Sequence, residues 1–97
     1  MKAKEYLEQI KPYIGNEGFE LNLVIIAKSI IMEGSELIKK RKCESKESLK
    51  AVFNECNLKF IALCNLIKKE TNLYNLDNDL FFSIFKQIMP DVYELIY

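Results

Sequence analysis

Three carboxylates on two consecutive predicted helices have the spacing that metal chemistry would need. Glu33 and Glu36 stand one helical turn apart, and Glu55 follows on the next helix. Carboxylates three residues apart share one face of an α-helix, and carboxylate oxygens are the ligands that Mg²⁺ prefers in proteins. A full set of such residues would predict a magnesium site between two helices.

This arrangement resembles one half of the site in all-α nucleotide pyrophosphohydrolases. In that family a Glu-x-x-Glu pair on one helix faces a Glu-x-x-Asp pair on the next, and together they hold magnesium. Here Glu55 is followed three residues later by Leu58, so the second pair is missing. We therefore interpret Glu33 and Glu36 as part of a solvated polar strip, and we predict no metal and no cofactor.

Several other catalytic chemistries are excluded by what the chain lacks. It has no histidine, which removes the commonest general base and any Ser-His or Cys-His nucleophile pair. Its three glycines, Gly15, Gly18 and Gly34, cannot be assembled into a phosphate-binding loop or a dinucleotide fingerprint. We predict no catalytic residue and a protein that is not an enzyme.

The three cysteines favour reduced thiols over disulfides. Cys56 and Cys64 would lie about 12 Å apart on one helix, which is too far for a bridge. They share an apolar face with Phe60, where a thiol behaves as a small hydrophobe. We expect inert thiols in a reducing, cytoplasmic environment.

A basic cluster lies at a predicted turn between two helices. Residues 39–70 carry nine basic and four acidic residues, although the whole chain has no net charge. Such a cluster can bind phosphate groups, or it can complement the end of a helix dipole and keep a turn solvated. The candidate nucleic-acid-binding residues are Lys39, Lys40, Arg41, Lys42, Lys46 and Lys50.

The last predicted helix is the most aromatic part of the chain. It contains Phe81, Phe82 and Phe85 beside Leu80 and Ile84. Successive helical positions diverge by about 100°, so these rings cannot all point the same way. They either pack densely inside the fold or form a surface for self-association or a partner. The partner-binding hypothesis rests on the three phenylalanines.

Four helical segments must position these residues. We expect helices over residues 2–10, 19–42, 45–70 and from 77 to the end, with caps at Ser45 and Asp77, Asp79 in a first turn, and a kink near Pro90. The third helix is the clearest, because eight apolar residues recur at offsets of three and four. These are Leu49, Val52, Phe53, Cys56, Phe60, Leu63, Cys64 and Ile67.

The second predicted helix has an apolar surface wider than one stripe, which is typical of a central helix packed on several neighbours. Gly34 inside it is either a site of close helix approach or a weak point costing about 1 kcal/mol relative to alanine. Pro12 should end or kink the first helix. Together the segments predict an all-α antiparallel bundle of about four helices, forming a single domain over residues 1–97.

The functional hypothesis is an accessory or regulatory protein that binds a protein partner and forms a homodimer. The alternative is a nucleic-acid-binding regulator that uses the basic turn from Lys39 to Lys50. We expect a cytoplasmic protein without a membrane segment, because the start of the chain lacks a signal-like apolar region and residues 21–32 are too short and too interrupted to span a bilayer. Abundant lysine, isoleucine and asparagine suggest an AT-rich genome, such as that of a low-GC bacterium, phage or mobile element.

Overall fold

The computed structural model describes residues 3–71 and 79–97, and within these ranges it contains helices and no strand. The α-helices are α1 (Ala3–Ile10), α2 (Gly18–Arg41), α3 (Lys46–Thr71), α4 (Leu80–Ile88) and α5 (Pro90–Ile96). A 3₁₀ turn, η1 (Lys11–Tyr13), follows α1. The predicted all-α class is confirmed, although the last predicted helix is divided in two.

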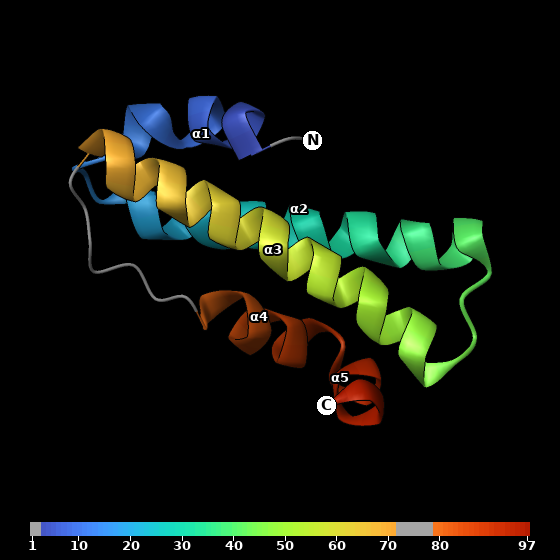
Figure 1. Ribbon diagram of the computed structural model, residues 1–97. Helices are drawn as coiled ribbons and strands as arrows, with labels where there is room; N and C mark the ends of the chain where they lie inside the picture. The colour runs from blue at the N-terminus through green and yellow to red at the C-terminus, as the bar shows by residue number, and fades with distance from the viewer. Residues whose placement is uncertain (1–2, 72–78) are drawn as a thin grey trace.

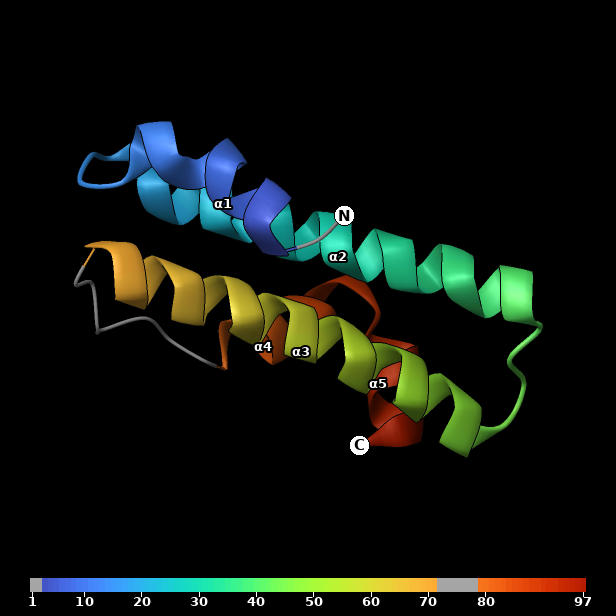
Figure 2. The same cartoon turned by 45° about the horizontal axis from the view of Figure 1, so that its top comes forward.

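Helices α2 and α3 form a long antiparallel hairpin at the centre of the molecule, which measures 41 × 21 × 18 Å (Figure 1). Helix α1 packs on both of them along one edge of the hairpin, and α4 packs on both along the opposite edge. Figure 2 shows the same arrangement after rotation, with α5 continuing from α4 beside α3. The buried side chains of all five α-helices therefore form one hydrophobic core.

The inner side of α3 supplies much of this core. All eight apolar residues that its spacing singles out are buried. The predicted N-cap is also present, because the backbone N–H of Ser48 donates to Ser45 Oγ at 3.1 Å. The period of three and four residues therefore predicted both the existence of this helix and the side that it buries.

Gly34 allows α2 and α3 to approach closely. A Cβ atom added to Gly34 would lie 2.9 Å from Cys56 Sγ and 3.2 Å from Phe53 Cε1. Both neighbours are buried, so neither has open space into which it can move. The structure therefore confirms that Gly34 is a site of close helix approach, which was one of the two interpretations of this residue.

A left-handed residue ends α2 at the basic turn. Lys42 has φ = 52°, its N–H donates to Lys39 O at 3.3 Å, and the N–H of Cys43 donates to Ile38 O at 3.0 Å. This is the Schellman pattern of helix termination, in which an apolar pair usually accompanies the hydrogen bonds. Ile38 and Cys43 both pack against the core and supply that pair.

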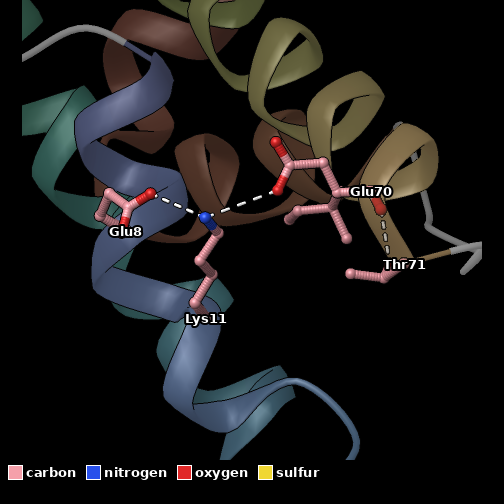
Figure 3. Close-up of polar contacts among 5 residues, drawn as sticks. Glu8, Lys11, Glu70 and Thr71 are labelled. Atoms are coloured by element: carbon pink, nitrogen blue, oxygen red, sulfur yellow. Dashed lines mark hydrogen bonds and ion pairs between the residues drawn. The ribbon is translucent and has the colours of Figure 1, made fainter.

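The first helix ends where Pro12 predicted a boundary. The α-helical part stops at Ile10, and Pro12 lies within η1. Lys11 Nζ lies 2.8 Å from a carboxylate oxygen of Glu8 and 3.6 Å from one of Glu70, next to Thr71 (Figure 3). The hydrogen bond to Glu8 raises the pKa of Lys11. These contacts join the end of α1 to the end of α3.

The last predicted helix differs from expectation at its start and again near Pro90. It begins at Leu80, so Asp79 lies at its N-cap position instead of in its first turn, and the expected cap Asp77 is outside the described residues. Instead of a kink there is a break, since Met89 adopts φ = −129° and ψ = 62° and α5 starts at Pro90. Proline fits a first helical position, where no N–H is needed.

Candidate interaction surfaces

The aromatic residues of α4 are largely core residues. Phe81 and Phe85 have no exposed surface, and Phe82 is partly buried. The ring of Phe85 stacks on Phe53 with centroids 4.2 Å apart, and the ring of Phe81 lies 6.1 Å from that of Phe60. Phe81 and Phe85 therefore present no exposed surface to a partner in this structure, because α4 packs onto the hairpin through them.

Phe82 instead lines an open groove at α4 and α5 together with Tyr93 and Tyr97, which we call the aromatic groove. Its ring lies 5.2 Å from that of Tyr97, and the hydroxyl of Tyr97 donates a hydrogen bond to Asn54 Oδ1. Lysine ammonium groups of the same chain lie over two of the rings, with Lys50 Nζ 5.4 Å from the centroid of Tyr97 and Lys86 Nζ 5.7 Å from that of Tyr93. The chain itself thus provides cationic contacts for these rings.

The six residues of the basic cluster divide into two groups. Arg41 Nη1 lies 3.5 Å from a carboxylate oxygen of Glu55, and Lys50 lies over Tyr97. The other four are Lys39, Lys40, Lys42 and Lys46, and all six residues are exposed. The cluster therefore stays accessible at this end of the hairpin, with two of its members also in contact with other side chains.

Of the three carboxylates that suggested metal chemistry, Glu33 and Glu55 contact other side chains, whereas Glu36 is exposed. The hydroxyl of Tyr6 donates to Glu33 Oε1 at 2.7 Å, and Lys59 Nζ lies 4.0 Å from Glu33 Oε2. Burial and the hydrogen bond to Glu33 raise the pKa of Tyr6. In residues 3–71 and 79–97, no group of three or more acidic or cysteine side chains is placed to hold a metal ion. Glu33 here joins α1 to α2.

None of the three cysteines forms a disulfide. Cys56 and Cys64 are buried in the core and Cys43 is partly buried. Burial raises the pKa of the Cys56 thiol. A buried thiol with a raised pKa is a poor nucleophile, so Cys56 acts in packing.

An apolar face that the sequence reasoning did not single out lies on α2. Leu21, Ile25 and Met32 are 64%, 44% and 56% exposed. Offsets of four and eleven residues place them within about 40° of one another around the helix. Lys28 falls on the same line, and we call these four residues the outer face of α2. The signal was present in the sequence as a heptad-like spacing of 21, 25, 28 and 32.

The outer face lies opposite the side of α2 that enters the core. Leu23, Ile26, Ile30 and Gly34 are buried, and their positions are displaced by about 140–220° from Leu21 around the helix. Between α1 and the outer face runs an open groove of about 510 Å³. Its lining residues are Tyr6, Gln9, Ile25, Lys28, Ser29, Met32, Glu33 and Glu36. The fold therefore leaves an apolar ridge with a groove beside it.

Of the helices in the described part of the chain, none is both long and apolar enough to cross a membrane. No protein family, curated protein or solved structure matches this chain.

Proposed function

We propose that this chain is a non-enzymatic accessory or regulatory protein that binds protein partners through the outer face of α2 and associates with itself. One observation carries the proposal, namely that three large apolar side chains lie half-exposed in line on a long, regular helix. An apolar ridge of this kind is typical of an interaction surface. Covering the exposed part of each side chain would contribute about 1 kcal/mol.

The absence of enzymatic activity, the cytoplasmic location and the origin in a phage or mobile element remain predictions from the sequence. The contacts of the candidate carboxylates support the first of these. Glu33 accepts a hydrogen bond from Tyr6, and Glu55 pairs with Arg41. Both side chains thus have a structural role that explains their presence.

Sedimentation of the purified protein over a concentration series tests the proposal. Replacing Ile25 and Met32 together by Asp introduces charge on the outer face without removing a buried side chain, so helicity should stay unchanged. The matched control is Leu58→Asp, which makes the same kind of change at a 65% exposed leucine on α3. We expect the average mass of the wild type and the control to rise with concentration, whereas the double variant stays monomeric.

Two outcomes would contradict this proposal. A wild-type chain that stays monomeric at all concentrations would remove self-association. Association of the double variant at the same concentrations as the control would show that the contact lies elsewhere on the molecule.

A second candidate function is nucleic-acid binding at the α2–α3 turn. It is favoured by the exposure of Lys39, Lys40, Lys42 and Lys46 together at one end of the hairpin. The test is fluorescence anisotropy with labelled duplex and single strands, at low and near-physiological salt. We expect the Lys39→Gln/Lys40→Gln variant to bind more weakly, with a flatter salt dependence. Equal weakening by Lys68→Gln/Lys69→Gln, at the other end of α3, would argue against a specific patch.

A further inference from the structure

We propose that the outer face of α2 packs against the same face of a second copy, with the two α2 helices antiparallel about a two-fold axis. This inference rests on the proposed function and adds to it the partner and the orientation. An isologous contact of this kind closes at two copies, because each copy uses the same surface. The expected product is a dimer and not an open chain of subunits.

Charge complementarity along α2 selects this partner and this orientation. Glu17 and Glu20 are exposed at the N-terminal end of the helix, and Lys39 and Lys40 are exposed at its C-terminal end. Antiparallel packing places the acidic end of each copy beside the basic end of the other, at both ends of the contact. Parallel packing would place like charges together at both ends, which is unfavourable.

The helix dipoles favour the same orientation. The N-terminal end of a helix carries a partial positive charge and the C-terminal end a partial negative one. In an antiparallel pair each end lies beside the opposite end of its neighbour. Helix α2 has 24 residues, or about 36 Å, so both charged ends and the apolar ridge between them can take part in one contact.

The positions of the charged residues also indicate where the two-fold axis falls. Glu17 and Lys39 lie within about 40° of Leu21 around the helix, whereas Glu20 and Lys40 lie about 100° to either side. Pairing Glu17 with Lys39 of the second copy places the axis at residue 28. In that register Ile25 lies within one residue of Met32 of the second copy, and Leu21 lies opposite Ser35, next to Glu36. Lys28 then lies near its own equivalent, where its long side chain can direct the ammonium group outward to water.

Charge reversal at the two ends tests the orientation. We expect Glu17→Lys/Glu20→Lys to weaken self-association about tenfold, and Lys39→Glu/Lys40→Glu to do the same, because each makes both contacting ends alike. The variant carrying all four substitutions should regain wild-type association, since opposite charges again meet at both ends. Association constants come from sedimentation equilibrium, and circular dichroism checks that each variant keeps its helicity.

A control separates this effect from a change of net charge. Asp91→Lys/Glu94→Lys alters the net charge as much as Glu17→Lys/Glu20→Lys does, but at exposed residues of α5. It should associate like the wild type. High salt should reduce the differences among all these variants, because it screens exposed charges.

The outcomes distinguish the inference from the function on which it rests. Loss of association by Ile25→Asp/Met32→Asp, combined with no effect of any charge reversal, would overturn the antiparallel pairing and leave the proposed function standing. Association that survives both kinds of change would overturn both. Weakening by each double reversal without recovery in the fourfold variant would also overturn the antiparallel pairing.

Discussion

Helices α2 and α4 both carry more apolar side chains than one buried stripe requires. On α4 the additional side chains are largely buried, whereas on α2 several remain exposed. Helix α4 is nine residues long and turns Phe81 and Phe85 fully into the core, where they contact aromatic rings of α3. Helix α2 already buries one side against α3 and α4, and its opposite side still exposes large apolar residues. The additional side chains of α4 stabilise the fold, whereas those of α2 are available to a partner.

This difference follows from position. Helix α4 lies along one edge of the hairpin and packs on α2 and α3 from one side, so Phe81 and Phe85 point toward the hairpin. Helix α2 lies at the centre between α1 and α4, and its core contacts occupy only part of its circumference. A wide apolar surface on a helix is therefore not enough to identify an interaction site, because the neighbours decide how much of it is covered.

The largest change in the free energy of unfolding should come from removing an aromatic ring of α4. Phe85→Ala should reduce the free energy of unfolding by about 3–5 kcal/mol, because it leaves a cavity beside Phe53. Leu21→Ala on the outer face of α2 should change it by less than about 0.5 kcal/mol. Urea unfolding followed by circular dichroism measures both, and similar losses in the two variants would break the contrast between the helices.

A substitution on the inner side of α2 should have a smaller effect on the free energy of unfolding. Gly34→Ala should destabilise the fold by about 1–2 kcal/mol, since strain against Cys56 and Phe53 exceeds the gain in helix propensity. Adding Cys56→Ala removes the nearest atom, so the double variant should lose less than the sum of the two single variants. Strict additivity in thermal or urea unfolding would show that the helices are not held at this distance by Gly34.

The hydrogen bond between Tyr6 of α1 and Glu33 of α2 should make the stability of the fold depend on pH in alkaline solution. The unfolded phenol of Tyr6 loses its proton near pH 10, whereas burial and Glu33 raise the pKa in the folded state. Above about pH 10 the unfolded chain therefore binds fewer protons than the folded one, and stability falls as the pH rises. Below pH 10 this contribution is fully present.

Tyr6→Phe isolates this contribution. It should cost about 1 kcal/mol near neutral pH through loss of the hydrogen bond to Glu33, and its midpoint of thermal unfolding should fall less steeply between pH 10 and 12 than that of the wild type. Tyr13→Phe, at an exposed tyrosine, serves as the control. Parallel slopes for the wild type and Tyr6→Phe would contradict the role given to this buried phenol.

Much of the fold could be predicted from the sequence, because local patterns specify it. The period of α3, the Ser45 cap and the boundary at Pro12 each depend on residues within one or two helical turns. The burial of Phe81 and Phe85 could not be predicted in this way, because it depends on the packing of α4 against Phe53 and Phe60. The cation contact between Lys50 and Tyr97 likewise joins residues that are far apart in the chain.

The candidate site was predicted less well than the fold. A wide apolar surface on the second helix was expected, yet the sequence does not say which part of it is covered by neighbours. The spacing of Leu21, Ile25 and Met32 becomes informative only once Ile26 and Ile30 are known to face the core. The basic turn was located correctly, but the engagement of Arg41 with Glu55 depends on the approach of α2 and α3.

Methyl-detected NMR with a soluble paramagnetic probe, recorded on dilute and concentrated protein, tests the central claim most directly. We expect the methyl signals of Leu21, Ile25 and Met32 to be broadened strongly in the dilute sample and protected in the concentrated one. The methyl signals of Leu58 should be broadened in both samples, and those of Ile84 in neither. Protection of Leu58 on concentration, with the outer face of α2 still broadened, would contradict the account.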